Sequence, residues 1–117
     1  MIEEPIILYG DAGADVFLSI EAAEQYAEPI DIQNGEYTAY DAAGKILSLS
    51  VSLNGFHGSL SLPEPHKHGR EELVRALRRL LRSIASARKV PFDQASIKDY
   101  SLKELLEICI QNNYYTQ

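Results

Sequence analysis

Apolar and polar side chains alternate strictly from Leu47 to Leu53, with leucine or valine at each odd position and serine at each even position. The same alternation returns in Ser59–Leu62, after a turn rich in glycine and asparagine. A period of two is typical of a strand that buries one face. The two segments therefore predict a β-hairpin with a leucine face and a serine face.

Three shorter apolar runs predict further strands, at Ile6–Tyr9, Val16–Leu18 and Glu36–Tyr40. Residues 10–15 separate the first two runs with two glycines and two aspartates, which favour tight turns. We therefore expect a second hairpin at the start of the chain.

A helix is predicted between Ser19, a favourable N-cap, and Pro29, before which it must end. The spacing directs Ile20, Ala23, Tyr26 and Ala27 to one face and Glu21, Glu24 and Glu28 to the other.

Two more helices are predicted in the second half of the chain. In Arg70–Arg88 apolar residues recur at the spacing of one helical face, and Pro91 ends the region. Ser101–Glu104 has the pattern of a capping box and opens a last helix, which directs Leu102, Leu105, Leu106 and Cys109 inward.

The 117 residues are too few for two ordinary domains, so we expect one α+β domain over residues 1–117. We expect an antiparallel meander sheet, an early acidic helix, and two C-terminal helices packed on the leucine face. The single cysteine cannot form an internal disulfide, no secretory signal is visible, and no run approaches the roughly 20 apolar residues of a membrane helix. We therefore expect a cytoplasmic protein without membrane association.

Charge is distributed unevenly along the chain. Residues 1–64 carry eleven carboxylates and the single cation Lys45, a local net charge of −10, whereas residues 65–92 carry eight cations and two carboxylates, a local net charge of +6. Such segregation bears on partners more than on fold. The acidic segment favours a basic partner, and we expect contacts from Glu21, Glu24, Glu28, Asp31, Glu36 and Asp41, with Tyr37 and Tyr40 as anchors.

The segments Ser19–Asp31, Asn34–Asp41 and Gly44–Leu47 resemble small bacterial immunity proteins encoded beside secreted polymorphic toxins, including those of contact-dependent inhibition systems. The resemblance implies a non-enzymatic cytoplasmic protein that neutralises a cognate toxin domain by binding it. Together with the acidic segment, it predicts a toxin with a basic active-site surface, such as a nuclease.

Two other functions remain open. The arginine-rich helix 70–88 would suit a nucleic acid or an acidic partner, although a net charge of −6 weighs against nucleic acid. His66 and His68, with His57 as a third ligand, suggest a metal site, but they lie in a segment rich in proline and glycine with no cysteine beside them. No paired nucleophile and base and no phosphate loop are visible, so we expect neither catalysis nor a cofactor.

Overall fold

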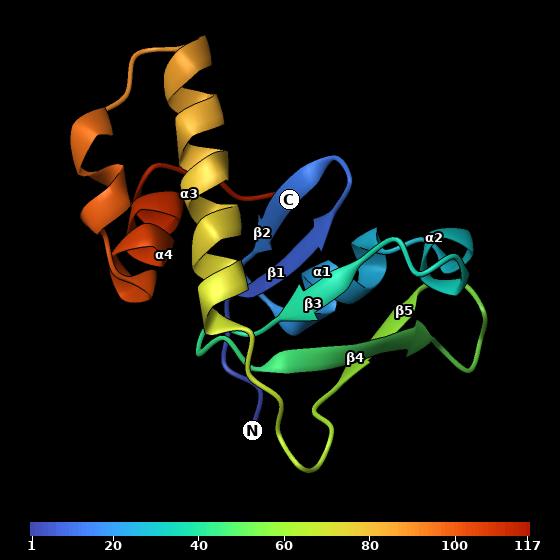
Figure 1. The fold of residues 1–117 in the computed structure, drawn as a ribbon. Coiled ribbons are helices and arrows are strands. Elements are labelled where there is room, and N and C mark those ends of the chain that lie inside the picture. Colours follow the sequence, from blue (N-terminus) through green and yellow to red (C-terminus); the bar gives the residue numbers. More distant parts are fainter.

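A computed structural model describes residues 1–117 as one five-stranded antiparallel sheet with helices on both faces (Figure 1). This architecture confirms the predicted α+β class. The strands are β1 (Ile6–Gly10), β2 (Gly13–Phe17), β3 (Thr38–Tyr40), β4 (Ile46–Val51) and β5 (Gly58–Ser61). The helices are α1 (Ile20–Tyr26), α2 (Pro29–Gln33), α3 (Arg70–Ala87), the 3-10 helix η1 (Gln94–Asp99) and α4 (Leu102–Gln111).

The strand order is β2-β1-β3-β4-β5, so only β3, β4 and β5 form a simple meander. β1 pairs with β2 on one side and with β3 on the other, with Ile7 opposite both Val16 and Tyr40. The connection through α1 and α2 is long enough to carry the chain past β1 before it returns to the sheet. Ile6, Ile7 and Leu8 are all buried because helices cover both faces of the sheet at β1, with Ile7 on the side of α3 and Ile6 and Leu8 on the side of α1.

Two apolar cores lie on opposite faces of the sheet. One joins Leu8, Leu47 and Leu60 to Ala23 and Ala27 of α1. The other joins sheet residues to α3, η1 and α4, and its members include Ile7, Val16, Tyr40, Leu73, Leu77, Leu81, Ile97 and Leu105. The C-terminal helices do pack on one face, but the expectation that it is the leucine face was wrong, because the small alanine face of α1 packs there.

The serine face of β4 and β5 consequently stays open, with Ser48, Ser50 and Ser61 exposed. Helix α3 covers the opposite half of that side of the sheet, where β1 and β2 lie (Figure 1). A strand pattern identifies which residues share a face but does not identify the element that covers it.

The predicted caps are confirmed. The Ala22 amide donates to Ser19 Oγ at 3.0 Å. At α4 the Glu104 amide donates to Ser101 Oγ at 3.2 Å, and the Ser101 amide donates to Glu104 Oε1 at 3.0 Å. The hydrogen bond from the Ser101 amide, followed by that from the Ser101 side chain, stabilises the ionised carboxylate and lowers the pKa of Glu104. None of the helices has the length and apolar character needed to cross a membrane.

Candidate partner-binding surface

The eight residues predicted to contact a partner fall into three groups in the structure. Glu21, Glu28 and Glu36 are exposed, whereas Tyr40 and Asp41 are completely buried. The remaining three, Glu24, Asp31 and Tyr37, are partly buried and hydrogen-bonded to other parts of the chain. The candidate surface is therefore smaller than the acidic segment suggested.

Asp41 is a structural carboxylate and not a contact residue. It accepts hydrogen bonds from the backbone amides of Glu3 at 3.1 Å, Ala43 at 3.0 Å and Lys45 at 2.9 Å. The Lys45 ammonium lies 3.5 Å from the same carboxylate. Asp41 thus joins the turn between β3 and β4 to the N-terminal segment, and a partner cannot reach it.

Tyr40 is likewise a core residue. Its hydroxyl donates to the Glu72 carboxylate on α3, which secures the start of that helix to the sheet. Burial, followed by the hydrogen bond to Glu72, raises the pKa of Tyr40. The sequence places Tyr40 beside exposed acidic residues, but β3 turns its side chain inward.

The side chain of Glu24 extends from α1 to the edge of the sheet, where it accepts a hydrogen bond. Its carboxylate accepts the Leu60 amide at 2.7 Å, on the side of β5 that has no neighbouring strand. An unpaired strand edge is prone to aggregation, and this contact protects it. Glu24 therefore stabilises the fold and contributes little to an open surface.

Asp31, Glu36 and Tyr37 lie together beside the turn between β1 and β2. The Tyr37 hydroxyl donates to Asp31 Oδ2 at 3.3 Å, and burial, followed by the charge of Asp31, raises the pKa of Tyr37 to about 12. Asp31 also raises the pKa of Glu36, first through hydrogen bonding and then through charge repulsion, to which Asp11 adds. These carboxylates therefore repel one another in the folded protein.

A depression of about 200 Å³ opens beside this cluster. Gly10 allows the backbone of Glu36 to lie close to β1, because a Cβ at position 10 would lie only 2.5 Å from the Glu36 carbonyl oxygen. No cation forms an ion pair with any of its carboxylates. We call this the acidic depression, and the residues that line it are Gly10, Asp11, Ala12, Gly13, Asp15, Tyr26, Glu36 and Tyr37.

Sequence reasoning assigned Asp11 and Asp15 only to a turn and directed Tyr26 inward. Tyr26 instead stays 42% exposed, with its ring 5.0 Å from that of Phe17. Helical spacing indicated the face on which Tyr26 lies, but the spacing did not show that part of this large ring stays open to solvent at the end of the seven-residue helix α1.

An apolar tip forms at the loop between β4 and β5. Leu53 is fully exposed and Phe56 is 82% exposed, although the strand pattern placed Leu53 on the buried face. The ladder ends at Val51 opposite Gly58, so Leu53 extends beyond the last strand pair. We call Leu53 and Phe56 the apolar tip.

Hydrogen bonds hold the loop of the apolar tip in one conformation. The Ser52 amide donates to the His57 carbonyl at 2.8 Å, the Gly55 amide to the Ser52 carbonyl at 2.9 Å, and the Phe56 amide to Asn54 Oδ1 at 3.0 Å. The two exposed side chains are therefore presented on an ordered turn. Two large apolar groups without cover on such a turn are typical of an interaction site.

Helix α2 connects the acidic depression to the apolar tip. Asp31 lies on α2, and the helix packs against β4 at the end of the molecule where the loop between β4 and β5 lies (Figure 1). Ile30, also on α2, is 63% exposed. The depression, α2 and the tip thus provide a surface with exposed apolar groups and unpaired negative charge.

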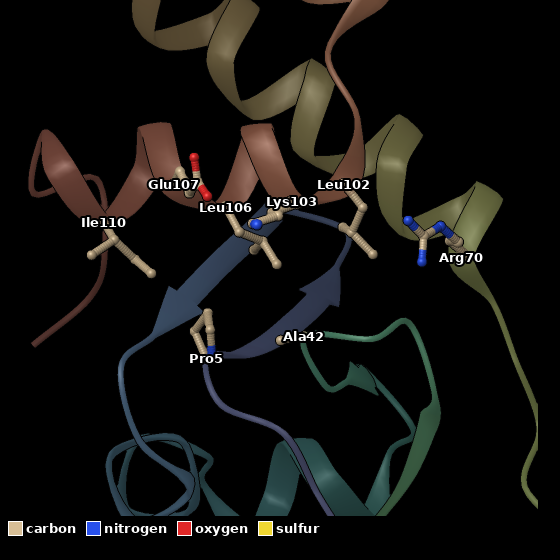
Figure 2. A pocket seen from close by; sticks show the side chains of 8 residues that line it. All are labelled: Pro5, Ala42, Arg70, Leu102, Lys103, Leu106, Glu107 and Ile110. Atoms are coloured by element: carbon tan, nitrogen blue, oxygen red, sulfur yellow. The ribbon is translucent and has the colours of Figure 1, made fainter.

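A second hollow, of about 290 Å³, lies between α4 and the N-terminal segment (Figure 2). From α4, the side chains of Leu102, Leu106 and Ile110 project toward Pro5 and Ala42. The charged residues that line this hollow are Arg70, Lys103 and Glu107. Its lining includes no nucleophile paired with a base, so it offers an apolar surface without evident reaction chemistry.

The histidines do not meet. His57 Nδ1 lies 2.8 Å from the Gly58 carbonyl oxygen, His66 Nε2 lies 2.9 Å from Glu64 Oε1, and His68 pairs with Lys45 in an isolated bridge. No group of three or more metal-ligating side chains is assembled. Burial raises the pKa of Cys109 to about 12, so its thiol stays protonated in the core.

Comparison with protein families, characterised proteins and solved structures finds no match to this chain. The resemblance to immunity proteins therefore stays a prediction. The class that fold and surface together define is an α+β protein with an exposed acidic and apolar face.

Replacing Glu36 by glutamine is expected to raise the melting temperature at pH 7. Because the pKa of Glu36 is raised, the folded protein holds this proton more tightly, and stability falls as pH rises from the ordinary value of 4.5 through the raised pKa. The gain should therefore vanish well below pH 4.5. Thermal melts at pH 7 and at a pH well below 4.5 test this prediction, with Glu107→Gln as an exposed control. An equal rise in melting temperature from the control would contradict it.

Proposed function

We propose that this protein is an immunity-type protein that binds and neutralises a secreted toxin domain with a basic surface, such as a nuclease, by occluding its active site. The resemblance of residues 19–47 suggests the class. The observation that carries the proposal is the unpaired negative charge of the acidic depression, connected through α2 to the apolar tip. Such a protein would act in the cytoplasm of the producing cell.

The two parts of this surface would have different roles. Unpaired carboxylates accelerate the encounter with a basic surface, an effect that salt weakens. Large apolar side chains that become desolvated in the complex slow its dissociation. Phe56 and Leu53, held on an ordered turn, would lose little conformational entropy on binding. They would take the anchoring role that Tyr40 cannot perform.

The charge component is tested with the partner that the proposal predicts, the toxic C-terminal domain of a secreted protein encoded beside this gene. Glu28→Lys combined with Glu36→Lys is expected to slow association about tenfold or more at low salt, with a smaller effect at high salt. Glu71→Lys combined with Glu107→Lys changes the net charge equally elsewhere and should slow association less. Failure of the unmodified protein to bind or to rescue growth would overturn the proposed function. If both double variants slow association equally, the acidic depression and α2 are not the surface that attracts the toxin.

The apolar tip is tested separately through dissociation. Phe56→Ala is expected to weaken binding by about 2 kcal/mol or more, mainly through faster dissociation, while the thermal melt is unchanged because the side chain is exposed. Leu18→Ala is the matched control, since Leu18 is exposed at the opposite end of β2 from the acidic depression. If Phe56→Ala leaves the dissociation rate unchanged, the tip is not part of the contact.

A further inference from the structure

Four arginines form a second charged site on α3. Arg75, Arg78, Arg79 and Arg82 recur at the spacing of one helical face, and they alone line a depression of about 340 Å³. Helical spacing predicts their common side, but only the structure shows that no other residue type lines the hollow. We call these residues the arginine cluster.

The charge of the arginine cluster is not neutralised within the chain. The ion pairs of the protein involve Lys45 and His66, and none includes an arginine. The nearby Glu72 carboxylate instead accepts the Tyr40 hydroxyl. Cations three and four positions apart on a helix repel one another weakly, and a bound anion would relieve this repulsion.

Arg78 is the most restrained member of the cluster. Its Nη2 donates to the Tyr100 carbonyl at 3.2 Å, which holds the guanidinium against the end of η1. Its Nε is buried and has no acceptor. Arg75, Arg79 and Arg82 are exposed and free to orient their planar donor groups toward a ligand. Guanidinium groups match phosphate oxygens in geometry and can bind them with two parallel hydrogen bonds.

Neighbouring carboxylates limit the size of that ligand. Arg79 also borders a hollow lined by Asp11, Glu36 and Glu72. A long polyanion that continued from the arginine cluster across this hollow would meet those negative charges. The surroundings therefore favour a compact anion that stays within the cluster over an extended nucleic acid.

We propose that the arginine cluster binds a compact polyphosphate group, such as the phosphate chain of a di- or triphosphate. This inference does not depend on the proposed toxin binding, since it concerns another surface and the opposite charge. The ligand can be inorganic or part of a nucleotide, because both present the same oxygens to the guanidinium groups.

Calorimetric titration of the purified protein with inorganic tripolyphosphate tests the proposal, and ATP without added metal distinguishes the sources. We expect one equivalent to bind, with amide NMR shifts confined to α3 and its neighbours, and with affinity that falls as salt rises. Arg75→Ala combined with Arg79→Ala should weaken binding about tenfold or more. Lys89→Ala combined with Lys98→Ala removes the same charge outside the cluster and should change affinity by less than about twofold.

Arg79→Lys combined with Arg82→Lys preserves charge and should still weaken binding several-fold, because lysine cannot form the paired hydrogen bonds. Equal affinity for ATP and tripolyphosphate identifies the phosphate chain as the recognised group, and tighter binding of ATP identifies a nucleotide. Absence of binding at millimolar tripolyphosphate, or equal weakening by the Lys89 and Lys98 pair, would overturn the proposal. Tighter retention of duplex DNA or RNA through the same arginines would replace it with an extended polyanion.

Discussion

Replacing Asp41 by alanine is expected to lower the free energy of unfolding by about 3–5 kcal/mol. The change removes the acceptor for three backbone amides and leaves the Lys45 ammonium without its buried partner. Because Asp41 is completely buried, water cannot replace these contacts without opening the turn between β3 and β4. Urea denaturation followed by circular dichroism measures the effect.

Asp41→Asn separates shape from charge. It keeps an acceptor for the Ala43 and Lys45 amides at the Oδ1 position, but its amino group would face the Glu3 amide, which now donates to Oδ2. We therefore expect Asp41→Asn to lower the free energy of unfolding, but by less than Asp41→Ala does. Asp99→Ala, an exposed change, should be nearly neutral. A loss from Asp41→Ala no larger than that of Asp99→Ala would show that the carboxylate does not hold the turn.

Leu77→Ala is expected to lower the free energy of unfolding by about 2–5 kcal/mol. The Leu77 side chain on α3 is completely buried in the core that α3 forms with η1, α4 and the sheet, and its truncation leaves a cavity. Leu49→Ala should cost less. Leu49 belongs to the leucine face, but it is only partly buried near the end of β4.

Ser50→Ala is the control for this series, since Ser50 projects from the open serine face and its change should stay within about 0.5 kcal/mol. The order Leu77, Leu49, Ser50 in urea midpoints is the expected result. A Ser50 effect as large as that of Leu77 would mean that something covers the serine face.

The two charged surfaces have different consequences for association. The acidic depression lies beside the turn between β1 and β2, whereas the arginine cluster lies on α3, and the two meet only where Arg79 borders Asp11 and Glu36. A basic partner and a compact phosphate would therefore approach different parts of the molecule. Salt should weaken both interactions, so measurements at several ionic strengths belong to each test.

The amino-acid sequence by itself determined the local elements. Alternation in residues 47–53 and 59–62 predicted β4 and β5, Ser19 and Ser101 predicted the caps, and Pro29 predicted the end of α1, although the sequence did not predict the short helix α2 that follows. These features depend on interactions within a few residues of the chain, such as caps, turns and side-chain periodicity, and a single sequence contains all of that information. The separation of charge into two segments was visible for the same reason.

Only the tertiary structure decided which faces were covered. The placement of α1 on the leucine face, the insertion of β1 between β2 and β3, and the use of Glu24 to cap the edge of β5 all join residues distant in sequence. Tyr40 and Asp41 appeared to be surface residues until α3 and the N-terminal segment covered them. Leu53 appeared to be buried, but it lies in the turn after β4, beyond the last strand pair of Val51 and Gly58. Burial depends on contacts between distant elements, and periodicity within one element does not specify them.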